Sequence, residues 1–258
     1  MNSPLVILQL TDLHYLAESG QTMSGVDTEL SFRRVLEYAQ SKLGKIDLIL
    51  VTGDLAQNPC ISSYQRIVKE LEKYQTRVVC LPGNHDDLSL MQQLISRQQI
   101  NCNKHLKYKH WQVICLNSKK TGSQGGYLAP DELEYLADTL KKQTDLNTLI
   151  AVHHHPVPTK SPWMDGMMIE NSDELFSLLK NHRHVKAIIC GHIHQELEIQ
   201  KNNLWVLGTP STCFQFEPLC TKYTLDSQQP EPGYRVLQLF PDGSIKSSVY
   251  RLPLDEAS

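Results

Sequence analysis

Five short motifs along the chain combine aspartate, asparagine and histidine, residue types that bind hydrolytic metal ions. They are Asp12-Leu13-His14, Gly53-Asp54, Gly83-Asn84-His85-Asp86, His153-His154-His155-Pro156 and Gly191-His192-Ile193-His194. Carboxylate and amide oxygens mixed with imidazole nitrogens, with no cysteine among them, suit a divalent metal ion in a hydrolytic site. Because a carboxylate has two oxygens, Asp54 could also bridge two cations, which would clamp the attacking and leaving oxygens of a phosphoryl displacement.

Each motif directly follows an apolar run that is typical of a buried strand. The five predicted strands are Val6–Leu10, Leu48–Thr52, Val78–Leu81, Leu149–Val152 and Ala187–Cys190. Loops at the carboxyl ends of such strands form the site in α/β folds, so we expect the five motifs to converge on one edge.

The spacing within the motifs suggests how the side chains reach that edge. Asp12 and His14 are two residues apart, so both are expected to leave the same face of an extended strand end, and His192 and His194 repeat this spacing. The glycine in each of the three glycine-containing motifs is expected to permit positive φ and a close backbone approach.

Each motif taken singly has an ordinary structural explanation, such as a turn or a solvated loop. Five of them in order, each at a strand end, are not explained in that way. The other histidines follow no such pattern and are interpreted as surface or hydrogen-bonded polar residues: His105, His110, His182 and His184.

The elements between the motifs predict an α/β core. Helical spacing of apolar residues indicates helices over Thr28–Leu43, Ser62–Lys73, Pro130–Lys142 and Ser172–Lys180. A further buried strand is predicted at Val113–Leu116. After His194 the pattern changes to short strands that we expect to be mostly antiparallel, at Leu204–Leu207, Tyr234–Phe240 and Ile245–Tyr250.

Composition excludes several classes of protein. The formal net charge of −3 and the absence of a basic stretch argue against a nucleic-acid partner. No segment approaches the length of a membrane span and Met1–Leu10 lacks a basic region, so neither a membrane partner nor a secretory signal is expected. Seven cysteines without a CxxC pair indicate reduced thiols in the cytoplasm. Because the motifs run from residue 12 to 194, we expect one domain over residues 1–258.

The five motifs together resemble those of the calcineurin-like metallophosphoesterases. This resemblance implies a four-layer α/β/β/α sandwich of two mixed sheets, with two metal ions bound between them. It implies that the first metal is bound by Asp12, His14, Asp54 and His194, and the second by Asp54, Asn84, His154 and His192. His154 is chosen because the family's ligand stands two residues before the proline, and His153 and His155 stay open as alternatives.

A narrower resemblance covers nearly the whole chain. Residues 52–57, 81–86, 153–158, 190–197 and 209–216, together with the Pro232–Arg235 stretch, are similar to the bacterial class III 3′,5′-cyclic-AMP phosphodiesterases of the CpdA/Icc type. Asn117 departs from the aspartate expected in close members of this group, at a position outside the ligand motifs. The resemblance implies hydrolysis of cyclic AMP to 5′-AMP by in-line attack of a metal-bound hydroxide, which would lower cellular cyclic AMP.

The expected roles follow from that chemistry. His85 is expected to protonate the leaving oxygen, because imidazole titrates near neutral pH. Asn84 is expected to orient the phosphate and Asp54 to bridge the metals, so the catalytic set is His85, Asn84 and Asp54. The residues expected to contact the substrate are His14, Asp54, Asn84, His85 and His194. Iron, manganese or both are the expected metals, with zinc as the alternative.

Base recognition is less defined by the sequence. The loop Pro156–Met168, with Trp163, Met164, Met167 and Met168, could line an adenine site, or could equally cap the core or form a dimer contact. Phe214 and Phe216 could contribute to the same site or could equally be core strand residues, and the oligomeric state stays open. Two further functions are considered: a phosphodiesterase or phosphomonoesterase of broader specificity, and a catalytically silent binding scaffold, which the filled ligand positions disfavour.

Overall fold

Two six-stranded mixed sheets form the centre of the molecule. The computed structural model describes residues 3–201 and 203–253. In spatial order the first sheet contains β14 (Ile245–Arg251), β13 (Gly233–Leu239), β1 (Leu5–Leu10), β4 (Leu48–Thr52), β5 (Val78–Leu81) and β6 (Ile100–Asn101). The second contains β11 (Leu197–Lys201), β12 (Leu204–Gly208), β10 (Val185–Cys190), β9 (Asn147–Ala151), β8 (Trp111–Cys115) and β7 (His105–Lys107).

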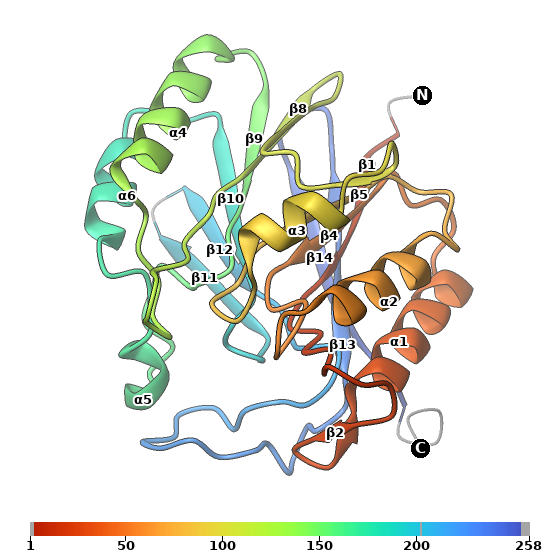
Figure 1. Cartoon of the computed structure of the whole chain (residues 1–258). Helices are drawn as coiled ribbons and strands as arrows, with labels where there is room; N and C mark the ends of the chain where they lie inside the picture. Colours follow the sequence, from red (N-terminus) through yellow and green to blue (C-terminus); the bar gives the residue numbers. More distant parts are fainter. Residues whose placement is uncertain (1–2, 202, 254–258) are drawn as a thin grey trace.

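Helices cover the outer face of each sheet (Figure 1). α1 (Thr28–Lys42), α2 (Ile61–Leu71) and α3 (Leu88–Leu94) pack on the first sheet, and α4 (Pro130–Lys142) and α6 (Ser172–Leu179) pack on the second. A short hairpin, β2 (Thr22–Met23) and β3 (Val26–Asp27), precedes α1, and the four-residue α5 (Pro162–Asp165) lies in the loop after β9. The predicted four-layer α/β/β/α sandwich of mixed sheets is therefore confirmed.

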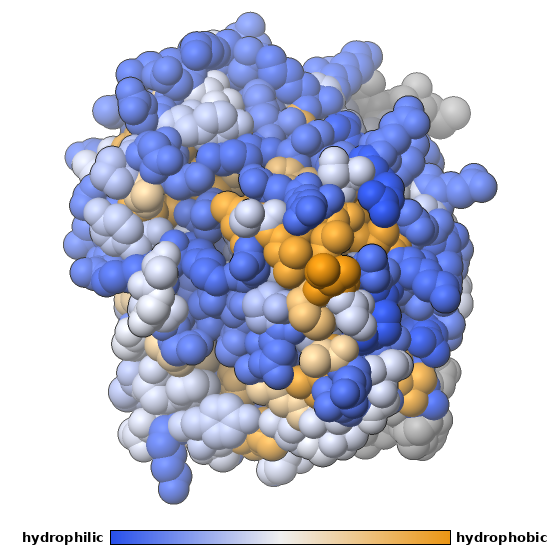
Figure 2. Space-filling model, in the orientation of Figure 1, coloured by the Kyte–Doolittle hydropathy of each residue, from blue (hydrophilic) through white to orange (hydrophobic). Residues whose placement is uncertain are grey.

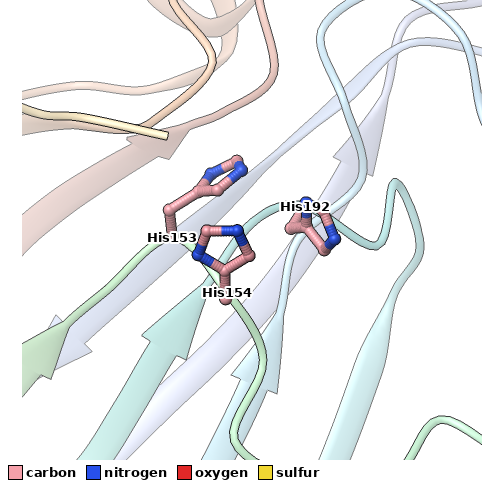
Figure 3. Close-up of side chains that lie close together, drawn as sticks. All are labelled: His153, His154 and His192. Carbon is pink, nitrogen blue, oxygen red and sulfur yellow. The ribbon is translucent and has the colours of Figure 1, made fainter. Parts of the chain in front are cut away.

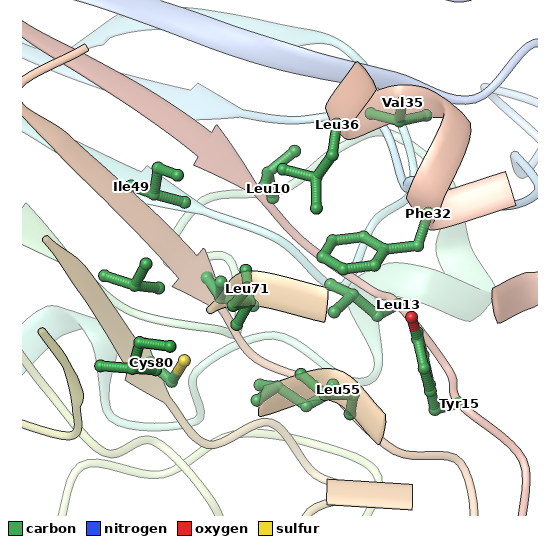
Figure 4. Close-up of a cluster of buried hydrophobic side chains, with 14 of the residues drawn as sticks. Leu10, Leu13, Tyr15, Phe32, Val35, Leu36, Ile49, Leu55, Leu71 and Cys80 are labelled. Atoms are coloured by element: carbon green, nitrogen blue, oxygen red, sulfur yellow. The ribbon is translucent and has the colours of Figure 1, made fainter. Parts of the chain in front are cut away.

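The central strands are apolar on both faces because each face is covered. In β4, Ile49 and Val51 face α1 and α2, whereas Leu48 and Leu50 belong to the layer between the sheets. Figure 4 shows the outer contact: Phe32 and Leu36 of α1 lie over Leu10 of β1. Burying side chains on both faces explains why these strands read as continuous apolar runs rather than as alternating ones.

The late strands are mostly antiparallel, as predicted, with one parallel pair and one strand that the sequence did not predict. β13 pairs antiparallel with β1 and with β14, and β11 pairs antiparallel with β12, as expected. β12, however, runs parallel to β10, with Ala187 opposite Trp205. The strand β11 was not predicted, because its sequence, Leu-Glu-Ile-Gln-Lys, is largely polar and its side chains are mostly exposed.

A chain of buried polar side chains joins the two sheets beneath the strand ends. Gln9 of β1 donates to Thr52 (3.0 Å) and accepts from Thr209 (2.7 Å), which follows β12. Arg235 of β13 is fully buried and donates to Thr209 (3.3 Å) and to Glu198 of β11 (2.6 Å). Because a buried polar group costs free energy unless it is hydrogen-bonded, this chain favours one relative placement of the sheets.

The most extensive apolar patch on the face drawn in Figure 2 lies over the position of α3. Leu88, Leu90 and Leu94 of this helix are each partly exposed. Within the described residues, no helix has the length and apolar character needed to cross a bilayer.

Candidate metal centre

The loops that follow β1, β4, β5, β9 and β10 bring the five motifs together where the two sheets meet. Asp12, after β1 of the first sheet, accepts hydrogen bonds from the backbone N–H of His192, after β10 of the second sheet, at 3.0 and 3.2 Å. The backbone N–H of His85 donates to Asp54 Oδ1 at 2.9 Å. The convergence predicted from the strand ends is therefore observed.

Five of the predicted ligands have backbones in the left-handed region. Their φ values are +55° at Asp12, +48° at His14, +49° at Asp54, +68° at His192 and +48° at His194. The expectation that Asp12 and His14 leave an extended strand end was wrong, because both lie beyond the last residue of β1. Aspartate, asparagine and histidine tolerate this conformation better than other side chains do.

The glycines also differ from expectation. Of the three, only Gly53 has a positive φ, +99°. Gly191 is needed for close approach instead, because a Cβ there would lie 2.8 Å from Asp12 Oδ2. A Cβ on Gly83 would lie 2.8 Å from Asp54 Cγ, so a side chain at either position would displace a carboxylate.

In one half of the centre two imidazoles face each other. His14 Nε2 lies 3.1 Å from His194 Nε2, and His194 Nε2 lies 3.5 Å from Asp12 Oδ1. The other nitrogen of each ring has its own partner: His14 Nδ1 lies 2.8 Å from Gln57 Oε1, and His194 Nδ1 lies 2.7 Å from the carbonyl of Phe214. With both Nδ1 atoms donating, the two Nε2 lone pairs point at one another, an arrangement that a bound cation satisfies.

The other half shows the same convergence around Asp54. His153 Nδ1 donates to the carbonyl of Thr52 at 2.9 Å, which turns Nε2 toward the centre. That Nε2 lies 3.3 Å from Asp54 Oδ2 and 3.1 Å from Asn84 Oδ1, both of which are acceptors. Asn84 Nδ2 donates to Gln124 Oε1 at 2.6 Å, which fixes its oxygen toward the centre.

The three consecutive histidines, residues 153–155, have different hydrogen-bond partners. His154 Nδ1 lies 2.7 Å from Ser118 Oγ, and its Nε2 lies 3.2 Å from the carbonyl of Gln124. His155 is buried beside Asp165, 3.9 Å from its carboxylate. Of the three, His153 lies nearest Asp54, and the predicted ligand His154 lies in one cluster with His153 and His192, its ring centroid 4.6 Å from that of His192 (Figure 3).

Burial and the opposing charges set the protonation of these groups. Burial would raise the pKa of Asp54, but His153 and His14 outweigh it and hold the pKa well below its usual range. Burial lowers the pKa of His14 to about 4, which favours the neutral imidazole that metals bind. For His153, burial is outweighed by the Asp54 carboxylate, which raises the pKa to about 9.

An ionised Asp54 beside the neutral imidazole of His14 can hold a cation, which would also take the place of the proton that Asp54 favours on His153. The side chain of His192 supplies a further sign, because its Nε2 is buried without a partner. Four overlapping groups of His and Asp side chains place ligand atoms within 4.8 Å of one another, and Asp54 or Asp12 belongs to three of them. The donor set thus fits a pair of divalent metal ions bridged by Asp54.

Sequence reasoning missed the residues that orient the ligands. Gln57 and Gln124 bind His14 and Asn84 across separations of 43 and 40 residues. Asp86 is the last residue of the Gly83–Asp86 motif, but the sequence did not predict that it would join two loops. Its carboxylate accepts from the backbone N–H groups of Leu55, Ala56 and Gly83 and from the hydroxyl of Tyr64, which ties the loop after β4 to the loop after β5.

The chain belongs to the calcineurin-like phosphoesterase family, which it matches over residues 5–196. It is 39% identical over 247 residues to a Haemophilus influenzae protein named 3′,5′-cyclic adenosine monophosphate phosphodiesterase CpdA, covering 95% of this chain and 89% of that protein. The Escherichia coli K12 protein of the same name is 38% identical over 247 residues, again covering 95% of this chain and 89% of that protein. A Nostoc protein named 3′,5′-cyclic-nucleotide phosphodiesterase is 36% identical, covering 97% of this chain and 93% of that protein.

Solved structures support the fold. A dimetal phosphatase from Danio rerio superposes with a TM-score of 0.67 at 13% identity, covering 97% of this chain and 100% of that chain. A purple acid phosphatase from yellow lupin superposes with a TM-score of 0.65 at 13% identity, covering 100% of this chain and 55% of that chain. The two-sheet sandwich is thus shared with phosphatases of distant sequence.

Proposed function

We propose that this protein hydrolyses 3′,5′-cyclic AMP to 5′-AMP at a dinuclear metal centre. The observation that carries the proposal is the convergence of three buried imidazole Nε2 atoms, those of His14, His153 and His194, on the carboxylates of Asp12 and Asp54. The names of the relatives with 34–39% identity give the substrate its class, a cyclic mononucleotide.

The metal ligands divide into two sets that share Asp54. Asp12, His14, Asp54 and His194 would hold the first ion. Asp54, Asn84, His153 and His192 would hold the second, with His153 in place of His154. Iron, manganese or both are the proposed metals, and zinc suits the same mixed nitrogen and oxygen donors. Such a pair of ions supplies an activated water and neutralises the charge of the phosphoryl oxygens.

The side chains of the chain itself provide orientation and proton transfer. One N–H of Asn84 is held by Gln124, which leaves the other free to donate to a phosphoryl oxygen. His85 is half-buried, its backbone is fixed by Asp54, and its ring lies 5.4 Å from that of His14. This position at the edge of the centre suits a general acid that protonates the 3′ oxygen as it leaves. His14, Asp54, Asn84, His85 and His194 are the proposed substrate contacts.

The whole chain is proposed to act as one domain. The late strands β13 and β14 complete the first sheet beside β1, so the segment after the last ligand, His194, is part of the scaffold of the site. All seven cysteines are free, and we propose the reducing cytoplasm as its location.

The test combines metal analysis with a comparison of substrates. The purified protein is expected to contain two metal ions per chain and to hydrolyse cyclic AMP with a higher kcat/KM than cyclic GMP, a glycerophosphodiester or an aryl phosphodiester. Similar values for all four would replace the proposal by a phosphodiesterase of broad specificity. Metal binding without hydrolysis of any of them would support the silent scaffold.

A further inference from the structure

The connection between β12 and β13, residues 209–232, borders the candidate metal centre. Near its start, the ring of Phe216 stacks on His194 with centroids 4.2 Å apart, and the ring of Phe214 lies 5.7 Å from that of His14. Both rings are buried, so they support metal ligands and do not face solvent. The connection then runs along the lower edge of Figure 1, from α5 to the β2–β3 hairpin.

Tyr223 on this connection has a different environment. The residue is 52% exposed, yet it contacts Phe216 of the same connection and two segments distant in sequence. Its ring makes edge contacts with Phe216 at 5.2 Å and with Trp163 of α5 at 5.7 Å. Its hydroxyl lies 3.2 Å from Ser24 Oγ, in the turn of the β2–β3 hairpin. The ring is therefore presented to solvent in a fixed orientation, which lowers the entropy cost of binding a flat ligand.

We propose that Tyr223 is the platform on which the base of the nucleotide stacks. The ring is reached from His194 in two ring-to-ring steps, 4.2 Å to Phe216 and 5.2 Å to Tyr223. This separation suits a base that is linked to a metal-bound phosphate through a ribose. The half-exposed ring offers stacking to a purine, and its two ring partners, Phe216 and Trp163, belong to an apolar cluster that also includes Met23, Val26 and Met167. The inference rests on the proposed function and adds the residue that recognises the base.

The experiment compares two substrates that differ only in the base: cyclic AMP, and the 3′,5′-cyclic phosphate of methyl riboside, in which a methoxy group replaces adenine. Tyr223→Ala is expected to lower kcat/KM for cyclic AMP by about 5- to 150-fold, mainly through KM. The base-free diester is expected to lose less than about twofold. Tyr223→Phe, which retains the ring, is expected to restore most of the loss, and Leu219→Ala, at a 67% exposed position of the same connection, serves as the control.

Several outcomes would overturn the inference. An equal loss for both substrates would show that Tyr223 has only a structural role. Unchanged hydrolysis of cyclic AMP by Tyr223→Ala would show that the base does not stack on Tyr223, while leaving the proposed function intact. Melting temperature and metal content identify a variant that merely misfolds. If the wild-type protein hydrolyses only base-free diesters, the proposed function fails. Quenching of tryptophan fluorescence by 5′-AMP in the wild type and in Tyr223→Ala then decides the platform alone, with equal affinities contradicting it.

Discussion

The floor of the candidate metal centre and its rim differ in how each side chain is held. On the floor, formed by the seven proposed ligands, the Nδ1 atoms of His14, His153 and His194 each have a dedicated partner, and these rings are buried. On the rim, formed by the β2–β3 hairpin, α5 and residues 217–232, Tyr223 depends on edge contacts and one exposed hydrogen bond. The floor side chains are therefore held by buried or half-buried partners, whereas Tyr223 is held by contacts that solvent reaches.

Asp54→Ala tests the floor most severely. Because Asp54 is the only proposed ligand shared by both metals, its loss is expected to abolish metal binding and hydrolysis together. Elemental analysis and steady-state kinetics on the same sample measure both quantities. Retained turnover with two bound ions would contradict the bridging role.

His85→Ala is expected to lower kcat for cyclic AMP by about 10²- to 10⁴-fold, because the leaving 3′ oxygen needs a proton. For an aryl diester, whose leaving group is stable without a proton, kcat is expected to stay near the wild-type value. Kinetics on the two substrates give the answer. An equal effect on both would exclude the acid role and point to a loss of the backbone geometry at Asp54.

His153→Ala and His154→Ala form a matched pair. Removing His153 is expected to release one metal and to lower activity by more than about 100-fold, since loss of a mere outer partner already costs 10- to 100-fold. His154→Ala removes a ring held by Ser118 and Gln124 and is expected to retain both metals. Metal stoichiometry of the two variants is the measurement, and the reverse pattern would restore His154 as the ligand.

Gln57→Ala removes the partner of His14 Nδ1 without touching a metal. We expect a loss of about 10- to 100-fold in metal affinity or activity, because the imidazole loses its fixed tautomer and orientation. Titration of the metal-free protein with Mn²⁺ measures the affinity. Unchanged affinity would show that the floor does not depend on its outer partners.

Ser24→Ala tests the rim and has the smallest expected effect. A hydrogen bond between two exposed side chains contributes little, so kcat/KM for cyclic AMP is expected to change by less than about threefold. Metal content is expected to stay at the wild-type value. A loss of metal in this variant would mean that rim and floor are coupled and that their separation is wrong.

The sequence predicted the edge of the fold at which the site lies and most of its residues. Strand ends could be predicted because apolar runs stop abruptly at Leu10, Thr52, Leu81 and Cys190. The sequence could not predict which histidine of the triplet faces Asp54. That orientation depends on the backbone after β9 and on a hydrogen bond to Thr52 in the other sheet. The partners Gln57 and Gln124 were equally hidden, because they lie in loops that only folding brings near the ligands.

The left-handed backbone at five proposed ligands limits how this centre could be redesigned. Only glycine adopts that conformation freely, and among side chains that bind metals, aspartate, asparagine and histidine bear it best. Replacing one of the five by a β-branched residue would add backbone strain to the loss of a ligand. An engineer who wishes to change the metal preference would therefore do better to vary Asn84 or His153, whose φ values are ordinary.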